Sequence, residues 1–243
     1  MNFRVGDKPR RNVLVSTDQG LMIVNRWDRD SNGVGHSSWL MDHGNVSTVE
    51  VDTCVRALEG VQGPRIFDVG ANIGTYTTWM AEIFPGGRIY SFEPQRAVFQ
   101  MLCGNVAINN LYNVYTYNMG LGDENTYVEF NEPNYFNNCD FGTFTLTTQE
   151  HVERTEDTFT VEIKTLDSFI DIHKIDRADL LKIDVEGMDM AVLRGAQRTI
   201  KKFLPKIFIE HSNNVVSIKD EILAFLEPYG YECQIIGNNI LAK

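Results

Sequence analysis

The segment IFDVGANIGTYTTWM, residues 66–80, constrains the fold of this 243-residue chain more than any other segment. A short apolar run ends near Asp68, Gly70 and Gly74 follow, and the spacing of apolar residues then becomes helical. A buried strand, a glycine turn and a helix in this order are typical of the first βα unit of an open α/β sheet. Such sheets bind ligands beyond the carboxyl ends of their strands, so the turn is a predicted binding site.

Short β-rich runs alternate with helical patterns along most of the chain after residue 60, which predicts βαβ units and a doubly wound, mostly parallel α/β sheet. The last residues, YECQIIGNNILAK, predict an antiparallel hairpin with a turn at Gly237 and Asn238. The expected strands cover 65–70, 88–94, 114–120, 180–186 and 206–211, and the expected helices cover 75–83, 96–109, 189–203 and 217–226.

Two regions fall outside this alternation. Residues 1–60 form an N-terminal extension, a candidate lid, in which His36 and His43 are candidates to reach over the site. The extension predicts a strand pair at 13–16 and 20–24, a loop at 28–38 and a helix at about 47–58. Residues 61–243 are expected to form one domain with an inserted loop region at 124–168. A loop that long inside a compact domain is more often a lid or binding segment than a plain connection.

Composition narrows the range of partners. The net charge of −11 and the pI near 4.9 would repel a phosphate backbone, so no nucleic-acid partner is expected. No apolar run reaches the roughly 18 residues of a membrane helix. The first residues lack the apolar core of a secretory signal, so we expect a cytoplasmic protein. The sequence leaves the oligomeric state open.

The acids around the glycine turn suggest the ligand. A dinucleotide fingerprint needs G-x-G-x-x-G, and Asn72 stands where the middle glycine would be. Asp68 would suit a cationic ammonium group, and Glu93, 25 residues later at the end of the second strand, could accept hydrogen bonds from ribose hydroxyls. These features describe an adenosine ligand with an amino-acid tail, as in S-adenosylmethionine. The alternative is a turn with a structural role alone.

In chain order, FDVGANIGTYT, SFEPQ, TLDSF at 165–169, LLKIDVEGMDMAVLRGA and PKIFIEH make residues 64–212 resemble the FkbM family of S-adenosylmethionine-dependent methyltransferases. The resemblance implies a class I, Rossmann-like sheet of about seven strands, the last two forming the hairpin. It also implies S-adenosylmethionine as cofactor, with the GLGD turn near the adenine and Leu121, Gly122 or Asp123 as the candidates there. The cofactor-binding residues that it implies are Asp68, Gly70, Asn72, Gly74, Glu93, Leu121 and Asp123.

The KIDVEG segment is the expected reactive end of the site, because it ends the strand across the switch point from the first strand. Glu186 is the preferred active-site acid. Lys182 either serves the site or forms an internal ion pair with Asp68 or Asp184. The catalytic candidates for taking a proton from an alcohol acceptor are Asp184, Glu186, Glu210 and His211. The same side chains could hold Mg²⁺, but their spacing is not diagnostic of a metal site.

The sequence therefore predicts a methyltransferase that acts on oxygen. Its acceptor, by the resemblance, is a hydroxyl of a sugar, glycan or small secondary metabolite. Two alternatives stay open at this point. One is an NAD-dependent oxidoreductase on a similar sheet, and the other is a non-catalytic protein that binds S-adenosylmethionine.

Overall fold

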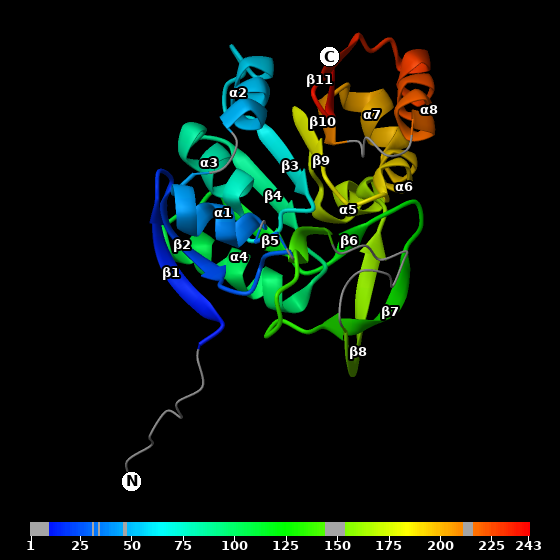
Figure 1. Cartoon of the computed structure of the whole chain (residues 1–243). Coiled ribbons are helices and arrows are strands. Elements are labelled where there is room, and N and C mark those ends of the chain that lie inside the picture. Colours follow the sequence, from blue (N-terminus) through cyan, green and yellow to red (C-terminus); the bar gives the residue numbers. More distant parts are fainter. Residues whose placement is uncertain (1–9, 31, 34, 46–47, 144–153, 211–215) are drawn as a thin grey trace.

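A seven-stranded sheet forms the centre of the protein, whose computed structural model describes residues 10–30, 32–33, 35–45, 48–143, 154–210 and 216–243 (Figure 1). The sheet has the order β11-β12-β10-β9-β3-β4-β5. Its strands are β3 (Arg65–Val69), β4 (Arg88–Phe92), β5 (Val114–Tyr117), β9 (Leu180–Ile183), β10 (Lys206–Glu210), β11 (Cys233–Ile236) and β12 (Asn239–Ala242). Neighbours from β10 to β5 are parallel, whereas β12 is antiparallel to both β10 and β11. The predicted Rossmann-like fold with a C-terminal hairpin is confirmed.

Helices cover both faces of this sheet (Figure 1). One face carries α2 (Thr48–Ala57), α3 (Thr75–Ile83) and α4 (Arg96–Ile108), and the other carries α5 (Leu166–His173), α6 (Asp189–Gly195), α7 (Gln197–Phe203) and α8 (Val216–Leu226). Side chains of β3 alternate between the faces: Phe67 and Val69 belong to the core under α5–α8, and Ile66 belongs to the core under α2 and α3. Burial on both faces explains why the strands read as continuous apolar runs.

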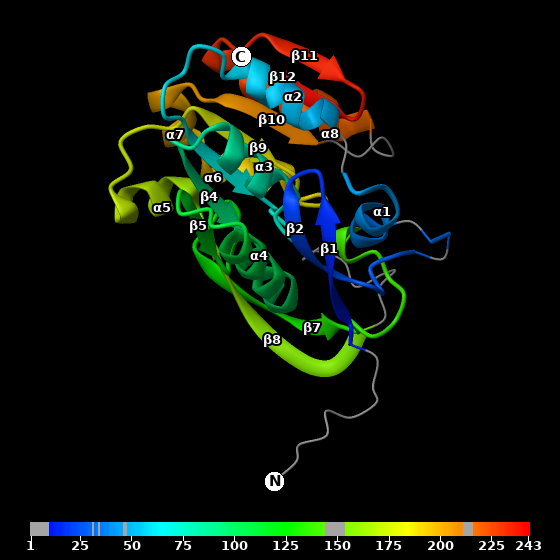
Figure 2. The same ribbon diagram turned by 90° about the vertical axis from the view of Figure 1, so that its left-hand side faces the viewer.

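The N-terminal segment packs against α4 (Figure 2). It contains a strand pair, β1 (Asn12–Thr17) and β2 (Gly20–Asn25), and then α1 (His36–His43). The Asn105 side chain of α4 binds the main chain of Ile23, accepting from its N–H at 2.6 Å and donating to its carbonyl at 3.1 Å. The strand pair was predicted, whereas the start of α1 lies in a segment that was expected to be a loop.

The inserted region, together with the residues just before it, forms a separate sheet of three strands, β6 (Gly120–Leu121), β7 (Thr126–Pro133) and β8 (Arg154–Lys164), in the order β6-β8-β7. The strand expected at 114–120 is therefore divided between two sheets, because β6 leaves the central sheet to pair with β8. Between β5 and β6, the Asn118 side chain donates to the carbonyl oxygens of Glu93 (2.9 Å) and Pro94 (3.1 Å), which fastens this departure to the end of β4.

Two further elements differ from the expectation. The strand expected at 180–186 ends at Ile183, so the acids that follow it stand on a turn. The helix expected at 189–203 is interrupted at Ala196 and becomes α6 and α7, where Gly195 lies against the main chain of Gly122. Two short 3₁₀ helices, Phe141–Thr143 and Glu227–Tyr229, complete the described elements.

The strand order places the site. After β3 the chain continues outward to β4 and β5, and it returns on the other side of β3 as β9. The switch point of the sheet thus lies between β3 and β9, and their carboxyl ends open onto the same crevice.

Candidate active site

The turn that follows β3 passes very close to the end of β9. Gly70 has a φ of 81°, in the left-handed region, and a Cβ atom at this position would collide with the carbonyl oxygen of Asp184. The amide of Asp184 also donates to the carbonyl of Val69 at 3.0 Å. Only glycine satisfies both the backbone conformation and this close approach.

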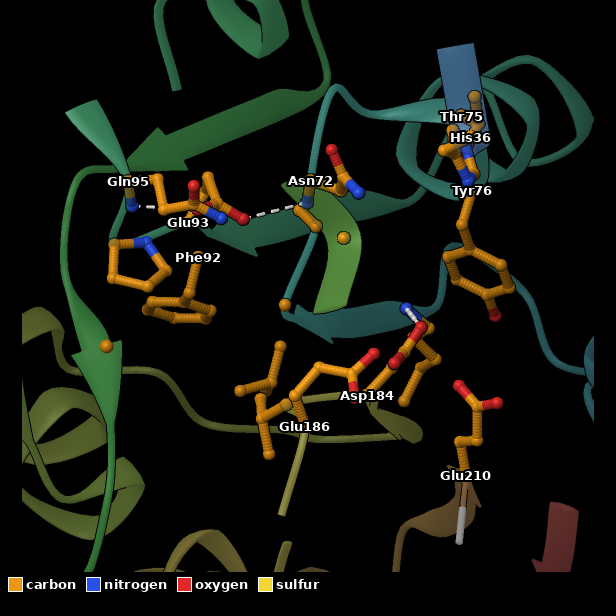
Figure 3. Close-up of a pocket in the computed structure, with 18 of the residues that line it drawn as sticks. His36, Asn72, Thr75, Tyr76, Phe92, Glu93, Gln95, Asp184, Glu186 and Glu210 are labelled. Carbon is orange, nitrogen blue, oxygen red and sulfur yellow. Dashed lines mark hydrogen bonds and ion pairs between the residues drawn. The ribbon is translucent and has the colours of Figure 1, made fainter. Parts of the chain in front are cut away.

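A buried carboxylate at the end of β4 holds the same turn. Glu93, only 4% exposed, accepts hydrogen bonds from the main-chain amides of Asn72 (3.0 Å) and Gln95 (2.8 Å) (Figure 3). Burial raises the pKa of Glu93 to about 7, and the hydrogen bonds from the two main-chain amides oppose that rise. Each carboxylate oxygen can accept a further hydrogen bond, so Glu93 both fixes the turn and keeps capacity for a ligand.

The crevice is a cavity of about 410 Å³ with two different ends. At one end, Glu93 borders a slot whose walls include Phe92, Pro94, Met119 and Leu121. At the other end lie His36, Thr75, Tyr76, Asp184, Glu186 and Glu210 (Figure 3). The cavity thus joins an apolar slot with one acid to a polar end with several.

Lys182 forms the internal ion pairs that one of the two sequence interpretations proposed. Its ammonium group lies 3.4 Å from Asp68 Oδ1 and 3.0 Å from Asp184 Oδ2. Burial alone would lower the pKa of Lys182, but the two carboxylates raise it well above its usual range. Asp68 is completely buried and also accepts from the Thr77 hydroxyl at 2.6 Å. Lys182 therefore carries a permanent positive charge that these two acids already neutralise.

The acids at the polar end differ in proton affinity. Burial alone would raise the pKa of Asp184, but the charge of Lys182 keeps it below its usual value. Partial burial and then the charge of Asp184 raise the pKa of Glu186 to about 7 and that of Glu210 to about 8. Glu186 lies at the edge of the cavity with a φ of 48°, a conformation that few residues other than glycine adopt. Glu186 and Glu210 can thus each take up or release a proton near neutral pH.

The N-terminal segment closes one wall of the polar end. The His36 Nε2 atom lies 2.7 Å from the hydroxyl oxygen of Thr75, the first residue of α3. Burial lowers the pKa of His36, although nearby acids oppose this. The start of α1 is fixed by Asp28, whose carboxylate accepts from the amide (2.8 Å) and hydroxyl (2.5 Å) of Ser37 and from the amide of Phe141 (2.9 Å).

The structure brings most of the predicted residues together. The ones that line the cavity are Gly70, Asn72, Glu93, Leu121, Asp184 and Glu186. Asp68 is not in the lining, because its side chain points toward Thr77 and Lys182. Gly74 faces Leu102 of α4, and Asp123 points to the surface, where it pairs with Arg194 at 3.3 Å. His211 lies outside the described residues.

Sequence reasoning missed Trp39 and Glu50, and it gave His36 no more than a candidate place in a lid. All three line the cavity from α1 and α2. No motif marked them, since they reach the site only through the packing of the N-terminal segment. Among the described residues, no group of three or more His, Cys, Asp or Glu side chains is arranged to hold a metal ion, and the prediction of Mg²⁺ remains untested. No helix within the described ranges is long and apolar enough to cross a bilayer.

The lining fits a nucleoside with a charged tail better than a dinucleotide. The slot beside Glu93 offers apolar walls to a base and a carboxylate to a ribose. A pyrophosphate would meet acids instead of free cations, because Lys182 is already paired.

Comparison with known proteins gives consistent matches. Residues 68–233 match the Methyltransferase FkbM domain family. Methyltransferase 1 of Beauveria bassiana (strain ARSEF 2860) is 29% identical over 162 residues, which cover 60% of this chain and 63% of that protein. Methyltransferase sdnD of Sordaria araneosa is 26% identical over 208 residues, covering 74% of this chain and 78% of that protein.

A solved structure shows the same fold. The methyltransferase FkbM from Methylobacillus flagellatus KT aligns with a TM-score of 0.54 at 18% identity, covering 75% of this chain and 44% of that one. The chain thus spans less than two thirds of the Beauveria protein and less than half of the Methylobacillus protein.

Proposed function

Because the chain belongs to the FkbM family of S-adenosylmethionine-dependent methyltransferases, we propose that it moves the methyl group of S-adenosylmethionine to a hydroxyl of a sugar, glycan or small secondary metabolite. One observation carries this proposal: a single cavity contains both a slot suited to adenosine at Glu93 and proton-accepting acids at Glu186 and Glu210. The donor and the group that activates the acceptor would therefore meet in one space.

We assign the apolar slot at Glu93 and the turn at Gly70 and Asn72 to the cofactor. Glu93 would accept hydrogen bonds from the ribose hydroxyls, and Phe92 and Leu121 would flank the adenine. Gly70 and Asn72 would lie along the methionine part, since the main chain of their turn borders the cavity. Asp68 would act through Lys182 and Thr77, because its own carboxylate lies behind the lining.

Bound S-adenosylmethionine supplies a methyl group on a sulfonium centre, which is already a good leaving group. The protein then has two tasks: to align the acceptor and to remove its proton. We assign proton removal to Glu186, whose pKa near 7 suits a base at neutral pH. Asp184 is a weaker base because Lys182 holds it ionised, and its role would be to orient the acceptor. Glu210 and His211 are the other candidates.

Calorimetric titration tests the cofactor assignment first. S-adenosylmethionine and S-adenosylhomocysteine should each bind at micromolar concentration, and NAD⁺ should not bind. Transfer of a radioactive methyl group to a panel of hydroxyl compounds then tests the activity. Binding of NAD⁺ alone would overturn the proposal. Binding of both S-adenosyl compounds with no transfer to any acceptor would favour the non-catalytic alternative.

We also propose that the protein is cytoplasmic, that its partner is a small molecule or carbohydrate, and that it binds neither nucleic acid nor membrane. The net charge of −11 supports the absence of a nucleic-acid partner. A requirement for Mg²⁺ can be checked by adding a chelator to the transfer assay.

A further inference from the structure

Carboxylates dominate the lining of the active-site cavity. The acids that line it are Glu50, Glu93, Asp140, Asp184, Glu186 and Glu210. Among the residues that the structure describes, Lys182 is the one lysine or arginine in the lining, and it already pairs with Asp68 and Asp184. The cavity therefore holds more carboxyl groups than cationic side chains to pair with them.

This excess of carboxyl groups lies at the polar end of the cavity. Glu93 is satisfied by two main-chain amides at the other end, and Asp184 is paired with Lys182. Glu50 has a long hydrogen bond, 3.4 Å, from the Asn239 side chain. Burial and the charge of Asp184 raise the pKa values of both Glu50 and Glu210, although Lys182 opposes the shift. Burial is the largest cause of both shifts, and a side-chain hydrogen bond between Glu210 and Asp184 adds to the second, so these acids hold protons where no free cation of the described residues reaches them.

A buried hydroxyl at the same end also lacks a proper partner. Tyr76 is 6% exposed, and its hydroxyl oxygen makes no hydrogen bond of ordinary geometry within the described residues. The Cys54 thiol near it is a weak donor and acceptor. Figure 3 shows the Tyr76 ring reaching from the first turn of α3 toward Asp184 and Glu210. A buried polar group without a good partner is costly unless a ligand satisfies it.

An aromatic ring also lines the cavity. Trp39 lines the cavity, is 48% exposed, and has one face stacked on His43 with ring centroids 4.0 Å apart. The stack orients the indole, and almost half of the residue stays exposed. Indole faces attract ammonium groups strongly.

We propose that the methyl acceptor is cationic: a hydroxyl compound that also carries an ammonium group, bound between Glu50, Glu210 and the face of Trp39. This inference rests on the proposed function. S-adenosylmethionine does not remove the need for a second cation, because its sulfonium and ammonium groups are offset by its own carboxylate and leave one net positive charge. A phosphorylated or carboxylated acceptor would meet repulsion instead.

The test is a calorimetric titration of the full chain saturated with S-adenosylhomocysteine. The probes are matched compounds that differ in charge: glucosamine and N-acetylglucosamine, tyramine and N-acetyltyramine, 1-amino-2-propanol and its N-acetyl form, with glucuronate as the anion. The amine should bind at least tenfold more tightly than its acetylated partner in one or more pairs. Glu50→Gln and Glu210→Gln should each reduce that ratio several-fold.

Glu82→Gln is the matched control, because it removes the same charge from an exposed position outside the cavity lining and should leave the ratio unchanged. Equal or tighter binding of the acetylated probes or of glucuronate would overturn the inference, and so would failure of every amine to bind. Saturation with S-adenosylhomocysteine separates the two proposals. If that first step fails, the proposed function itself is wrong.

Discussion

The main-chain amide of Asn72 donates a hydrogen bond to the carboxylate of Glu93 across 3.0 Å, so the acid that ends β4 holds the turn that follows β3. A side chain predicted to bind a ribose therefore also supports the backbone around it. Variants at Glu93 will affect both functions, and the two effects have to be measured separately.

Glu93→Gln should weaken the binding of S-adenosylmethionine by about 1–3 kcal/mol, since hydrogen bonds from the ribose to a charged acceptor are lost. Titration calorimetry measures this. Glu93→Ala would in addition leave the amides of Asn72 and Gln95 without an acceptor, so its urea midpoint should fall below that of Glu93→Gln. Unchanged affinity in Glu93→Gln would refute the ribose assignment.

The pH dependence of stability offers a second view of Glu93. Its pKa is about 7 in the folded protein and near the usual 4.5 in the unfolded chain, so the folded state binds more protons between these values. The free energy of unfolding of the ligand-free protein should therefore fall as pH rises from about 4.5 to 7, by at most about 1.4 kcal/mol per pH unit from this group. Urea denaturation at pH 5, 6 and 7 should show that the unfolding free energy of Glu93→Gln changes less with pH than that of the wild type. Identical slopes would contradict the raised pKa.

Glu186→Gln should lower kcat at least a hundredfold and change the affinity for S-adenosylmethionine little, because removal of a general base typically costs about 10²–10⁴ in rate. Single-turnover methyl transfer with a defined acceptor is the measurement. Glu82→Gln, outside the lining, should retain the wild-type rate. Normal turnover in Glu186→Gln would transfer the role to Glu210 or His211.

Lys182→Met should destabilise the protein by about 3–5 kcal/mol, because it leaves the fully buried Asp68 without its cation. The double variant Lys182→Met with Asp68→Asn should recover part of this loss. Chemical denaturation of the two variants gives the comparison. A single variant as stable as the wild type would mean that the ion pair has no structural role.

Two glycines with similar backbone angles separate steric collision from backbone strain. Gly70 and Gly187 have φ values of 81° and 92°, but a Cβ at Gly70 would strike the Asp184 carbonyl, whereas a Cβ at Gly187 has no neighbour within 4 Å. Gly187→Ala should cost about 1–3 kcal/mol from strain alone, and Gly70→Ala should cost clearly more or prevent folding. Thermal unfolding measures both. Equal losses would show that β3 and β9 can separate without penalty.

Sequence reasoning succeeded where the determinants are local. The glycine turn and Glu93 follow directly from a strand, a turn and the next strand, and the parallel sheet brings their ends together whatever the rest of the chain does. Asp68 was expected among the residues that contact the cofactor, but its side chain lies behind the cavity lining. The alternation of β3 directs its side chain toward Thr77 and Lys182, and no motif distinguishes a carboxylate in the lining from one behind it.

The polar end of the cavity could not be predicted in the same way. Trp39 lies on a helix of eight residues, too short to be stable alone, in a segment rich in glycine and serine. The helix is held by hydrogen bonds from Ser37 to Asp28, and Asp28 in turn binds a residue more than a hundred positions away. Such long-range pairing has no local signal in one sequence.

The carboxylate of Asp28 has a consequence for how acceptor choice can change in this family. It accepts hydrogen bonds from the amide of Ser37, at the start of α1, and from the amide of Phe141, so one side chain holds both segments in place. A relative's segment without an acid at this position would leave the amides of Ser37 and Phe141 without their acceptor and loosen both segments. Chimeras with a changed acceptor should therefore keep Asp28, or take the segments around Asp28 and Phe141 from the same parent protein.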